Sequence, residues 1–173
     1  GVVVPGGGPF ADAVRDAQPV LGFGDRAAHR MALLAMEQYG TALADLEPRL
    51  TPARTVAELQ ATCSPAVWMP LPLAETSDVA ENWDVTSDTL AVWLAGRIGA
   101  DCAVLVKSAA LPDAPSPADR LAAEGIVDPA LPERVARYAG TVWCVARSDH
   151  QRFAGALAQG TPVGTRVTGA VHA

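Results

Sequence analysis

The sequence predicts an α/β fold in which an open, mainly parallel sheet carries helices on both faces. Segments with strand character and segments with helical periodicity alternate along the chain, which is typical of that class. The strand-like run at residues 2–4 is short and apolar throughout, as expected for a strand buried on both faces of a parallel sheet. Half of the 173 residues are apolar, so the chain can bury a core and is expected to form one domain over residues 1–173.

The N-terminal half contains clear signals for the starts and ends of helices and strands. Three glycines at residues 6–8 interrupt the first strand, and Pro9 suits the start of a short helix over residues 9–18. A long helix is expected over residues 25–46, with Asp25 as its N-cap and apolar side chains along one face. The other expected elements of this half are a helix at 55–62, a strand at 66–69 and an acidic loop within 70–85.

The C-terminal half continues the alternation. Residues 86–89, Thr-Ser-Asp-Thr, are rich in capping side chains and precede a helix that reaches about Ile98. Residues 102–106 are the clearest strand of the chain. The remaining expected elements are a Pro-rich loop at 109–118, helices at 117–124, 130–139 and 149–159, and strands at 141–146 and 166–171.

Charge and composition argue against several partners. A net charge of −6 disfavours nucleic acid and anionic membranes, which attract basic surfaces. No apolar stretch reaches the ~20 residues of a membrane helix. Cys63, Cys102 and Cys144 lie far apart and are expected to be buried small side chains rather than ligands of a metal. We therefore expect a cytoplasmic protein with no protein-bound metal cluster.

Ligands of open α/β sheets bind beyond the carboxyl ends of the strands, and several such ends carry suitable residues. The glycine turn Gly6, Gly7 and Gly8 precedes a helix start, so it could admit a ligand oxyanion or could be a tight turn alone. The polar group before the helix at residue 90 could bind a ligand or could simply cap the helix. That group consists of Asp84, Thr86, Ser87 and Asp88.

Basic residues form the other candidates. Lys107, the only lysine, ends the strand at 102–106 together with Ser108, and it could meet a ligand or could be a surface residue. Arg26 and Arg30 share one face at the start of the long helix, beside His29. Arginines near a helix start oppose the helix dipole, and a bound phosphate or carboxylate would relieve that conflict. The alternative is a solvated basic face.

These clusters, in this order, resemble the amino acid kinase superfamily, which includes uridylate, acetylglutamate, aspartate and isopentenyl phosphate kinases. The resemblance extends over nearly the whole chain. It is carried by Val-Val-Pro-Gly-Gly-Gly-Pro at 3–9, Met-Ala-Leu-Leu-Ala-Met at 31–36, Thr-Ser-Asp-Thr-Leu-Ala at 86–91 and Val-Lys-Ser at 106–108. Within the superfamily, Ala-His-Arg-Met at 28–31 and Trp-Asp-Val-Thr-Ser-Asp at 83–88 most resemble the aminomethyl-furanmethanol phosphate kinase branch of methanofuran biosynthesis.

The resemblance implies a three-layer αβα sandwich, with the acceptor on the N-terminal half and ATP with Mg²⁺ on the C-terminal half. It implies phosphoryl transfer to a small phosphorylated or carboxylated acceptor. Asp88 would organise the site, and Lys107 would lie near the nucleotide phosphates. The other implied roles are substrate binding by Gly6, Gly7, Gly8, Arg26, His29, Arg30, Asp84, Thr86 and Ser87, and nucleotide binding by Ser108 and Asp128. A homodimer or higher homo-oligomer is also implied.

Two departures from the family pattern keep other functions open. Family members start one strand earlier and follow it with Lys-x-Gly-Gly-Ser, so the first strand is expected to be missing here and to lie upstream of Gly1. Ala109 and Ala110 stand where relatives often have an acidic residue and a glycine. One alternative is a non-catalytic nucleotide- or oxyanion-binding or storage protein on the same fold. A dinucleotide-dependent oxidoreductase is less favoured, because the glycine turn lacks G-x-G-x-x-G spacing.

Overall fold

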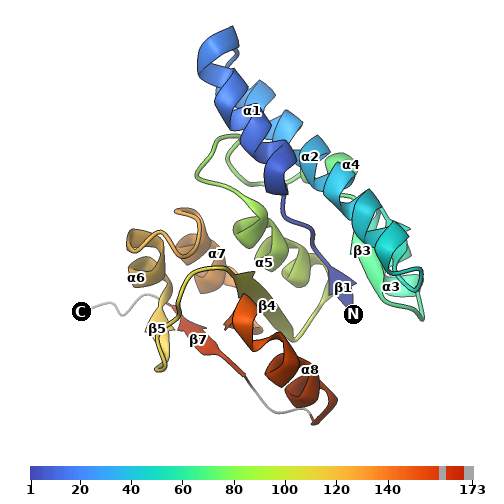
Figure 1. Ribbon diagram of the computed structural model, residues 1–173, viewed down its shortest axis with the longest axis vertical. Helices are drawn as coiled ribbons and strands as arrows, with labels where there is room; N and C mark the ends of the chain where they lie inside the picture. Colours follow the sequence, from blue (N-terminus) through green and yellow to red (C-terminus); the bar gives the residue numbers. More distant parts are fainter. Residues whose placement is uncertain (160–162, 170–173) are drawn as a thin grey trace. The chain divides into compact units, whose positions relative to one another are not determined.

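Strands and helices alternate along the chain in the computed structural model, which describes residues 1–159 and 163–169 (Figure 1). The chain divides into two compact units, Gly1–Ser87 and Asp88–Ala173. Each unit contains its own sheet, and four of the five strand pairings are parallel among the described residues. The predicted α/β class with a mainly parallel sheet is therefore confirmed.

The sheet of the first unit has the order β1 (Val2–Val3), β3 (Ala66–Trp68) and β2 (Thr51–Ala53). The central strand β3 is fully buried, in keeping with its uninterrupted apolar sequence. The flanking position of β1 leaves Val3 exposed and Val2 half-buried, so the prediction of a strand buried on both faces is wrong. The sequence analysis also missed β2, whose Pro52 is tolerated because the strand flanks the sheet.

Two long helices of the first unit, α1 (Gly8–Leu21) and α2 (Asp25–Leu46), pack along each other (Figure 1). α1 continues beyond the expected end at residue 18 and accommodates Pro19. α2 has the expected bounds, although Gly24 is its N-cap and Asp25 lies in its first turn. α2 also packs on β3, where a Cβ at Gly40 would lie 3.4 Å from Val67 Cγ2.

Short helices complete the first unit. α3 (Val56–Ala61) begins with a capping box between Thr55 and Glu58, which satisfies two backbone N–H groups at its start. α4 (Leu71–Ala74) lies within the segment that was expected to be a loop. Its first N–H, at Leu71, donates to the Glu37 carboxylate of α2 over 3.1 Å. This contact gives the first N–H of α4 a hydrogen-bond acceptor on α2.

The sheet of the second unit has the order β4 (Cys102–Lys107), β6 (Thr141–Ala146), β7 (Thr165–Thr168) and β5 (Ser116–Pro117). Its helices are α5 (Ser87–Ile98), α6 (Ala118–Ala123), α7 (Leu131–Arg137) and α8 (His150–Gln159), with a 3₁₀ turn η1 (Arg147–Asp149) before α8. β6 pairs in parallel with β4 and antiparallel with β7. The expected last strand at 166–171 extends partly beyond the described residues.

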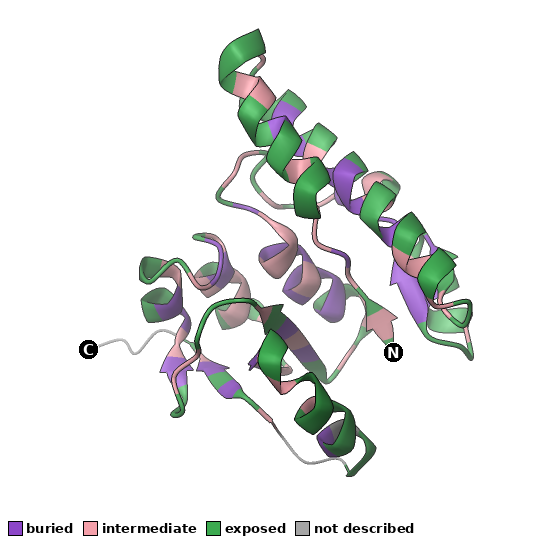
Figure 2. Cartoon of the chain, viewed as in Figure 1, coloured by how far each residue is buried: buried purple, intermediate pink, exposed green. Residues whose placement is uncertain are grey.

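One apolar core joins α5, α6 and α7 to β4 and β6, with Leu105, Leu121 and Leu131 among its members. α5 is buried over most of its surface, as its nearly continuous apolar sequence indicates (Figure 2). Of the cysteines, Cys144 belongs to this core, whereas Cys63 and Cys102 are exposed. The prediction that all three are buried is wrong, because Cys102 begins β4 on the face opposite the core and Cys63 follows α3 in a turn.

Among the residues that the structure describes, no helix combines the length and the apolar character needed to cross a membrane.

Candidate functional site

The carboxyl end of β4 and the first turn of α5 bring the two predicted catalytic side chains together. Lys107 Nζ donates to Asp88 Oδ2 over 2.6 Å. The Lys107 and Asp88 side chains are only 17% and 13% exposed, so water screens this ion pair weakly. The short distance is typical of a charge-assisted hydrogen bond. This hydrogen bond thus holds the ammonium of the single lysine of the chain in one orientation.

Opposing influences act on the Asp88 carboxyl. Burial raises its pKa above the ordinary value, whereas the charge and the hydrogen bond of Lys107 lower it in part. The nearby Asp128 charge raises the pKa of Asp88, and a hydrogen bond with the Asp128 backbone lowers it. The net pKa remains raised. Lys107 therefore matters most for keeping Asp88 ionised.

This balance predicts a pH-dependent effect of Lys107→Met on stability. A raised folded-state pKa means that the folded protein holds a proton more tightly than the unfolded chain, so stability falls as pH rises through this interval. Removing Lys107 raises the Asp88 pKa further and widens the interval. We expect the variant's loss of unfolding free energy, relative to wild type, to grow from about pH 4 to pH 7. Urea unfolding across this pH range measures it.

The double variant Lys107→Met, Asp88→Asn is the control, because it lacks the carboxyl whose titration causes the trend. Its stability difference from wild type should depend much less on pH than that of Lys107→Met. A pH-independent effect of Lys107→Met would contradict the role assigned to the pair.

Asp128 lies in the same cluster, which we call the Asp88 cluster: Asp88, Thr89, Lys107 and Asp128. The Asp128 side chain is buried, and its carboxylate accepts hydrogen bonds from the Thr89 backbone N–H over 3.0 Å and from the Thr89 hydroxyl. These bonds satisfy a backbone donor at the start of α5, as a cap does. Asp128 thus holds the first turn of α5, on which Asp88 lies. Sequence analysis did not single out Thr89, although its Thr-Ser-Asp-Thr segment was noted for capping.

Ser108 follows Lys107 and is exposed beyond the strand end. Within the described parts of the chain, no group of three or more His, Cys, Asp or Glu side chains is arranged to hold a metal ion.

The structural requirement for glycine differs among the three positions of the glycine turn in the first unit. A Cβ at Gly7 would lie 2.3 Å from Ala11 Cβ, closer than atoms can approach. Gly8 has φ +52°, a conformation that favours glycine, and it lies against the Tyr39 ring. A Cβ at Gly6 would meet only Ser87 Oγ, at an ordinary 3.8 Å. Gly7 and Gly8 are therefore required by the turn itself, whereas a Cβ at Gly6 would fit beside Ser87 without strain.

The remaining predicted substrate residues lie on or beside the loop that precedes α5. Thr86 is half-buried. Asp84 is exposed and belongs to a local turn, in which Asn82 Nδ2 donates to Asp84 Oδ2 over 3.3 Å and the Asp84 N–H donates back to Asn82. The structure therefore brings Gly6 beside Ser87 and places Asp84 at a separate, exposed turn.

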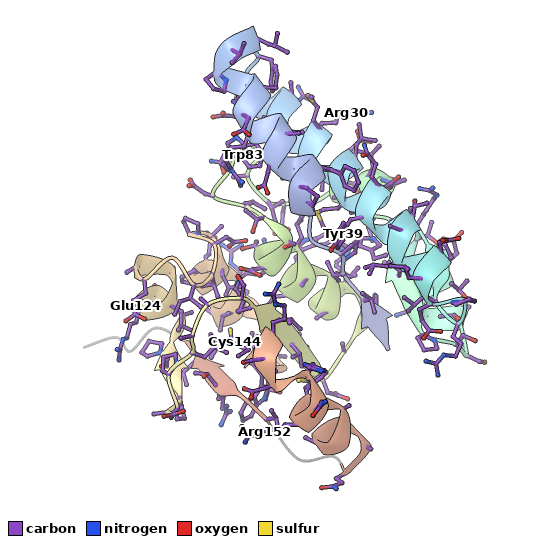
Figure 3. The ribbon with its side chains drawn as sticks, viewed as in Figure 1. Arg30, Tyr39, Trp83, Glu124, Cys144 and Arg152 are labelled. Carbon is purple, nitrogen blue, oxygen red and sulfur yellow. The ribbon has the colours of Figure 1, made fainter. Side chains whose placement is uncertain are left out.

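At the start of α2, Arg26, His29 and Arg30 all contact the same loop. Arg26 Nε lies 3.0 Å from Glu81 Oε2, and Arg30 pairs with Glu75. His29 is buried, which lowers its pKa, although a hydrogen bond with the Asn82 backbone and the Glu81 charge raise that pKa in part. Figure 3 labels Arg30 on α2. The anions that meet the two arginines here are thus carboxylates of the chain itself.

Comparisons with known proteins give one partial sequence relative and a solved structure of similar fold. No family model matches the chain. Over 97 residues the chain is 28% identical to the [5-(aminomethyl)furan-3-yl]methyl phosphate kinase of Methanocaldococcus jannaschii. That match covers 54% of this chain and 44% of the relative, so the matched segment spans less than half of the relative's length. Among solved structures, uridylate kinase from Archaeoglobus fulgidus is similar with a TM-score of 0.71 and 15% identity, covering 96% of this chain and 84% of that one.

Proposed function

We propose that this chain, which has the fold of the amino acid kinases and resembles that superfamily, transfers a phosphoryl group from ATP to a small phosphorylated or carboxylated acceptor. The observation that carries the proposal is the buried Asp88–Lys107 pair, which holds a cation where β4 ends and α5 begins. An ammonium at such a place can meet nucleotide phosphates and stabilise the charge of the transferring group. The similarity to an archaeal phosphate kinase supports the same chemistry.

In this proposal the second unit binds the nucleotide. Asp88 orients Lys107, and Ser108 follows Lys107 beyond the strand. Asp128 positions Asp88 by holding the first turn of α5. Mg²⁺ commonly binds phosphate oxygens and one or two carboxylates rather than a cage made by protein alone. Asp88, which pairs with Lys107, and the nearby Asp128 are the carboxylates that would hold it. When bound, Mg²⁺ neutralises charge on the nucleotide phosphates. The chain's own contribution is positioning and fixed charge.

The first unit would bind the acceptor, as the resemblance implies. Gly6, which has no side chain and lies beside Ser87, would let an oxyanion approach the backbone next to the start of α1. Arg26, Arg30 and His29 lie together on α2, and Asp84 and Thr86 belong to the segment leading to α5. The name of the Methanocaldococcus jannaschii relative supports aminomethyl-furanmethanol phosphate, of methanofuran biosynthesis, as the specific acceptor.

The proposal includes further expectations about an upstream segment, the cellular compartment and the oligomeric state. Catalysis requires the family's Lys-x-Gly-Gly-Ser segment upstream of Gly1. The protein acts in the cytoplasm as a homodimer or higher homo-oligomer. The competing function is a non-catalytic protein that binds or stores nucleotides or oxyanions on the same fold.

Acceptor-dependent ADP release tests the proposal. The full encoded protein is incubated with Mg-ATP and a panel of phosphorylated alcohols and carboxylates that includes the aminomethylfuran phosphate. We expect release to require both ATP and one acceptor, and calorimetry to show nucleotide binding in the absence of acceptor. Nucleotide binding without turnover on any acceptor would favour the storage function instead. Absence of nucleotide binding would contradict the kinase function and would leave only the oxyanion form of the competing function.

A further inference from the structure

The loop that follows α4 covers the start of α2. We call residues 75–84 the strap. Its Glu75 and Glu81 pair with Arg30 and Arg26, and its Asn82 backbone bonds the buried His29. The strap therefore contacts all three α2 side chains that the proposed function assigns to the acceptor.

The C-terminal end of the strap is firmly attached. Trp83 Nε1 donates to Gln18 Oε1 of α1 over 2.6 Å, and the Arg15 guanidinium lies 4.4 Å from the centre of the Trp83 ring. Gln18 in turn donates to Asp25 at the start of α2 over 2.8 Å. Figure 3 labels Trp83 beside these helices. Val85, directly after the strap, is buried. Hydrogen bonds, a cation–π contact and apolar burial thus hold this end.

The backbone N–H groups of residues 75–77 donate to carbonyl oxygens of α4, whereas two exposed ion pairs join the strap to the arginines of α2. The side chains of Arg26 and Glu81 are 88% and 45% exposed, and those of Arg30 and Glu75 are 61% and 37% exposed. Exposed ion pairs contribute little to stability and are screened by salt, so dissolved anions compete with them readily. These two ion pairs are therefore easier to break than the contacts of Trp83.

We propose that Glu75 and Glu81 compete with an anionic group of the acceptor for Arg30 and Arg26. When that group binds the two arginines, both ion pairs break and residues 78–81 detach from α2. The proposal rests on the proposed function in taking these arginines as acceptor residues. A phosphate offers the guanidinium groups the same paired oxygens as a carboxylate, with more negative charge. Trp83 keeps its contacts with α1, and residues 75–77 keep their backbone hydrogen bonds to α4.

The position of the two arginines on α2 also favours a bound anion beside them. They lie in the first two turns of α2, where backbone N–H groups already make the surroundings positive. Without an external anion, the strap's carboxylates relieve that repulsion. With one bound, the glutamates return to water, where their charge is well solvated. The exchange needs no change in the fold of either helix.

Titration with inorganic phosphate at low ionic strength tests the competition. We expect Glu75→Gln and Glu81→Gln each to tighten phosphate binding about two- to fivefold, the range that corresponds to losing one exposed ion pair. Arg26→Gln and Arg30→Gln should weaken binding. Asp45→Asn is the matched control, because it removes one negative charge from α2 roughly 30 Å along the helix from Arg26 and should leave phosphate affinity unchanged.

Hydrogen exchange supplies a second readout. Phosphate should speed exchange of backbone amides in residues 78–81 and leave those of residues 82–85 unchanged. Unchanged or slower exchange in 78–81, or equal phosphate affinity in the Glu→Gln variants and wild type, would overturn the proposal. Because the probe is phosphate alone, these results do not depend on ATP. If phosphate competes with the glutamates but the protein never turns over ATP, the strap proposal stands and the kinase function is contradicted. If the protein turns over ATP but phosphate does not compete with the glutamates, the kinase function stands and the strap proposal is contradicted.

Discussion

Replacing Asp88 with asparagine is expected to lower acceptor-dependent ADP release by about 10²–10³-fold, the usual loss when one charged or donor group at a transition state is removed. Asparagine keeps the size of the side chain but removes the charge that holds Lys107 at 2.6 Å. The ammonium then loses its fixed direction, and the charge stabilisation of the phosphoryl group falls. Steady-state ADP release at saturating Mg-ATP and acceptor measures the effect.

Two controls separate this role from a general loss of structure. Asp101→Asn makes the same substitution at an exposed residue just before β4 and should leave turnover unchanged. The double variant Asp88→Asn, Lys107→Met should lose little more activity than either single variant, because the two residues act as a unit. Circular dichroism should show that all variants retain the secondary structure. ADP release from Asp88→Asn at the wild-type rate would show that Asp88 is not part of the catalytic machinery.

Replacing Gly7 with alanine is expected to lower the free energy of unfolding by about 1–3 kcal/mol, the usual cost of forcing a methyl group into a packed site. Its Cβ would lie 2.3 Å from Ala11 Cβ, so the turn between β1 and α1 must shift. That shift also moves the start of α1, where the acceptor's oxyanion is proposed to bind. Urea unfolding measures the stability, and the KM for the acceptor measures the displacement.

Gly6→Ala is the matched control in the same turn. Its Cβ meets only Ser87 Oγ at 3.8 Å, so stability should stay within about 0.5 kcal/mol of wild type. If the acceptor approaches the backbone at Gly6, the added methyl group should still raise the acceptor KM. Equal destabilisation by both substitutions would contradict the different reasons assigned to the two glycines.

Features that depend on neighbouring residues could be predicted well. The strand at 141–146 and the helix at 25–46 have the expected bounds, because apolar periodicity and nearby glycines act over a few residues. The helix near residue 55 forms with a capping box that its own sequence contains. The alternation of these elements was enough to predict the α/β class and its mainly parallel sheets.

Features that depend on residues distant in the sequence could not be predicted from the sequence. β2 contains Pro52 and forms because it pairs with β3 at the side of the sheet. The different burial of Cys102 and Cys144 depends on which face of the sheet each side chain occupies. Periodicity within a short strand does not tell which face another element will cover.

The candidate site shows the same division. The sequence alone was sufficient to select Asp88, Lys107 and the glycine turn, because their residue types and order carry the family resemblance. Tertiary structure decided their partners: it paired Lys107 with Asp88, gave the Asp128 carboxylate to Thr89, and placed Glu75 and Glu81 on Arg30 and Arg26. The physical reason is that a side chain's chemistry belongs to its own residue, whereas an ion pair depends on the distance and burial produced when separate segments pack together.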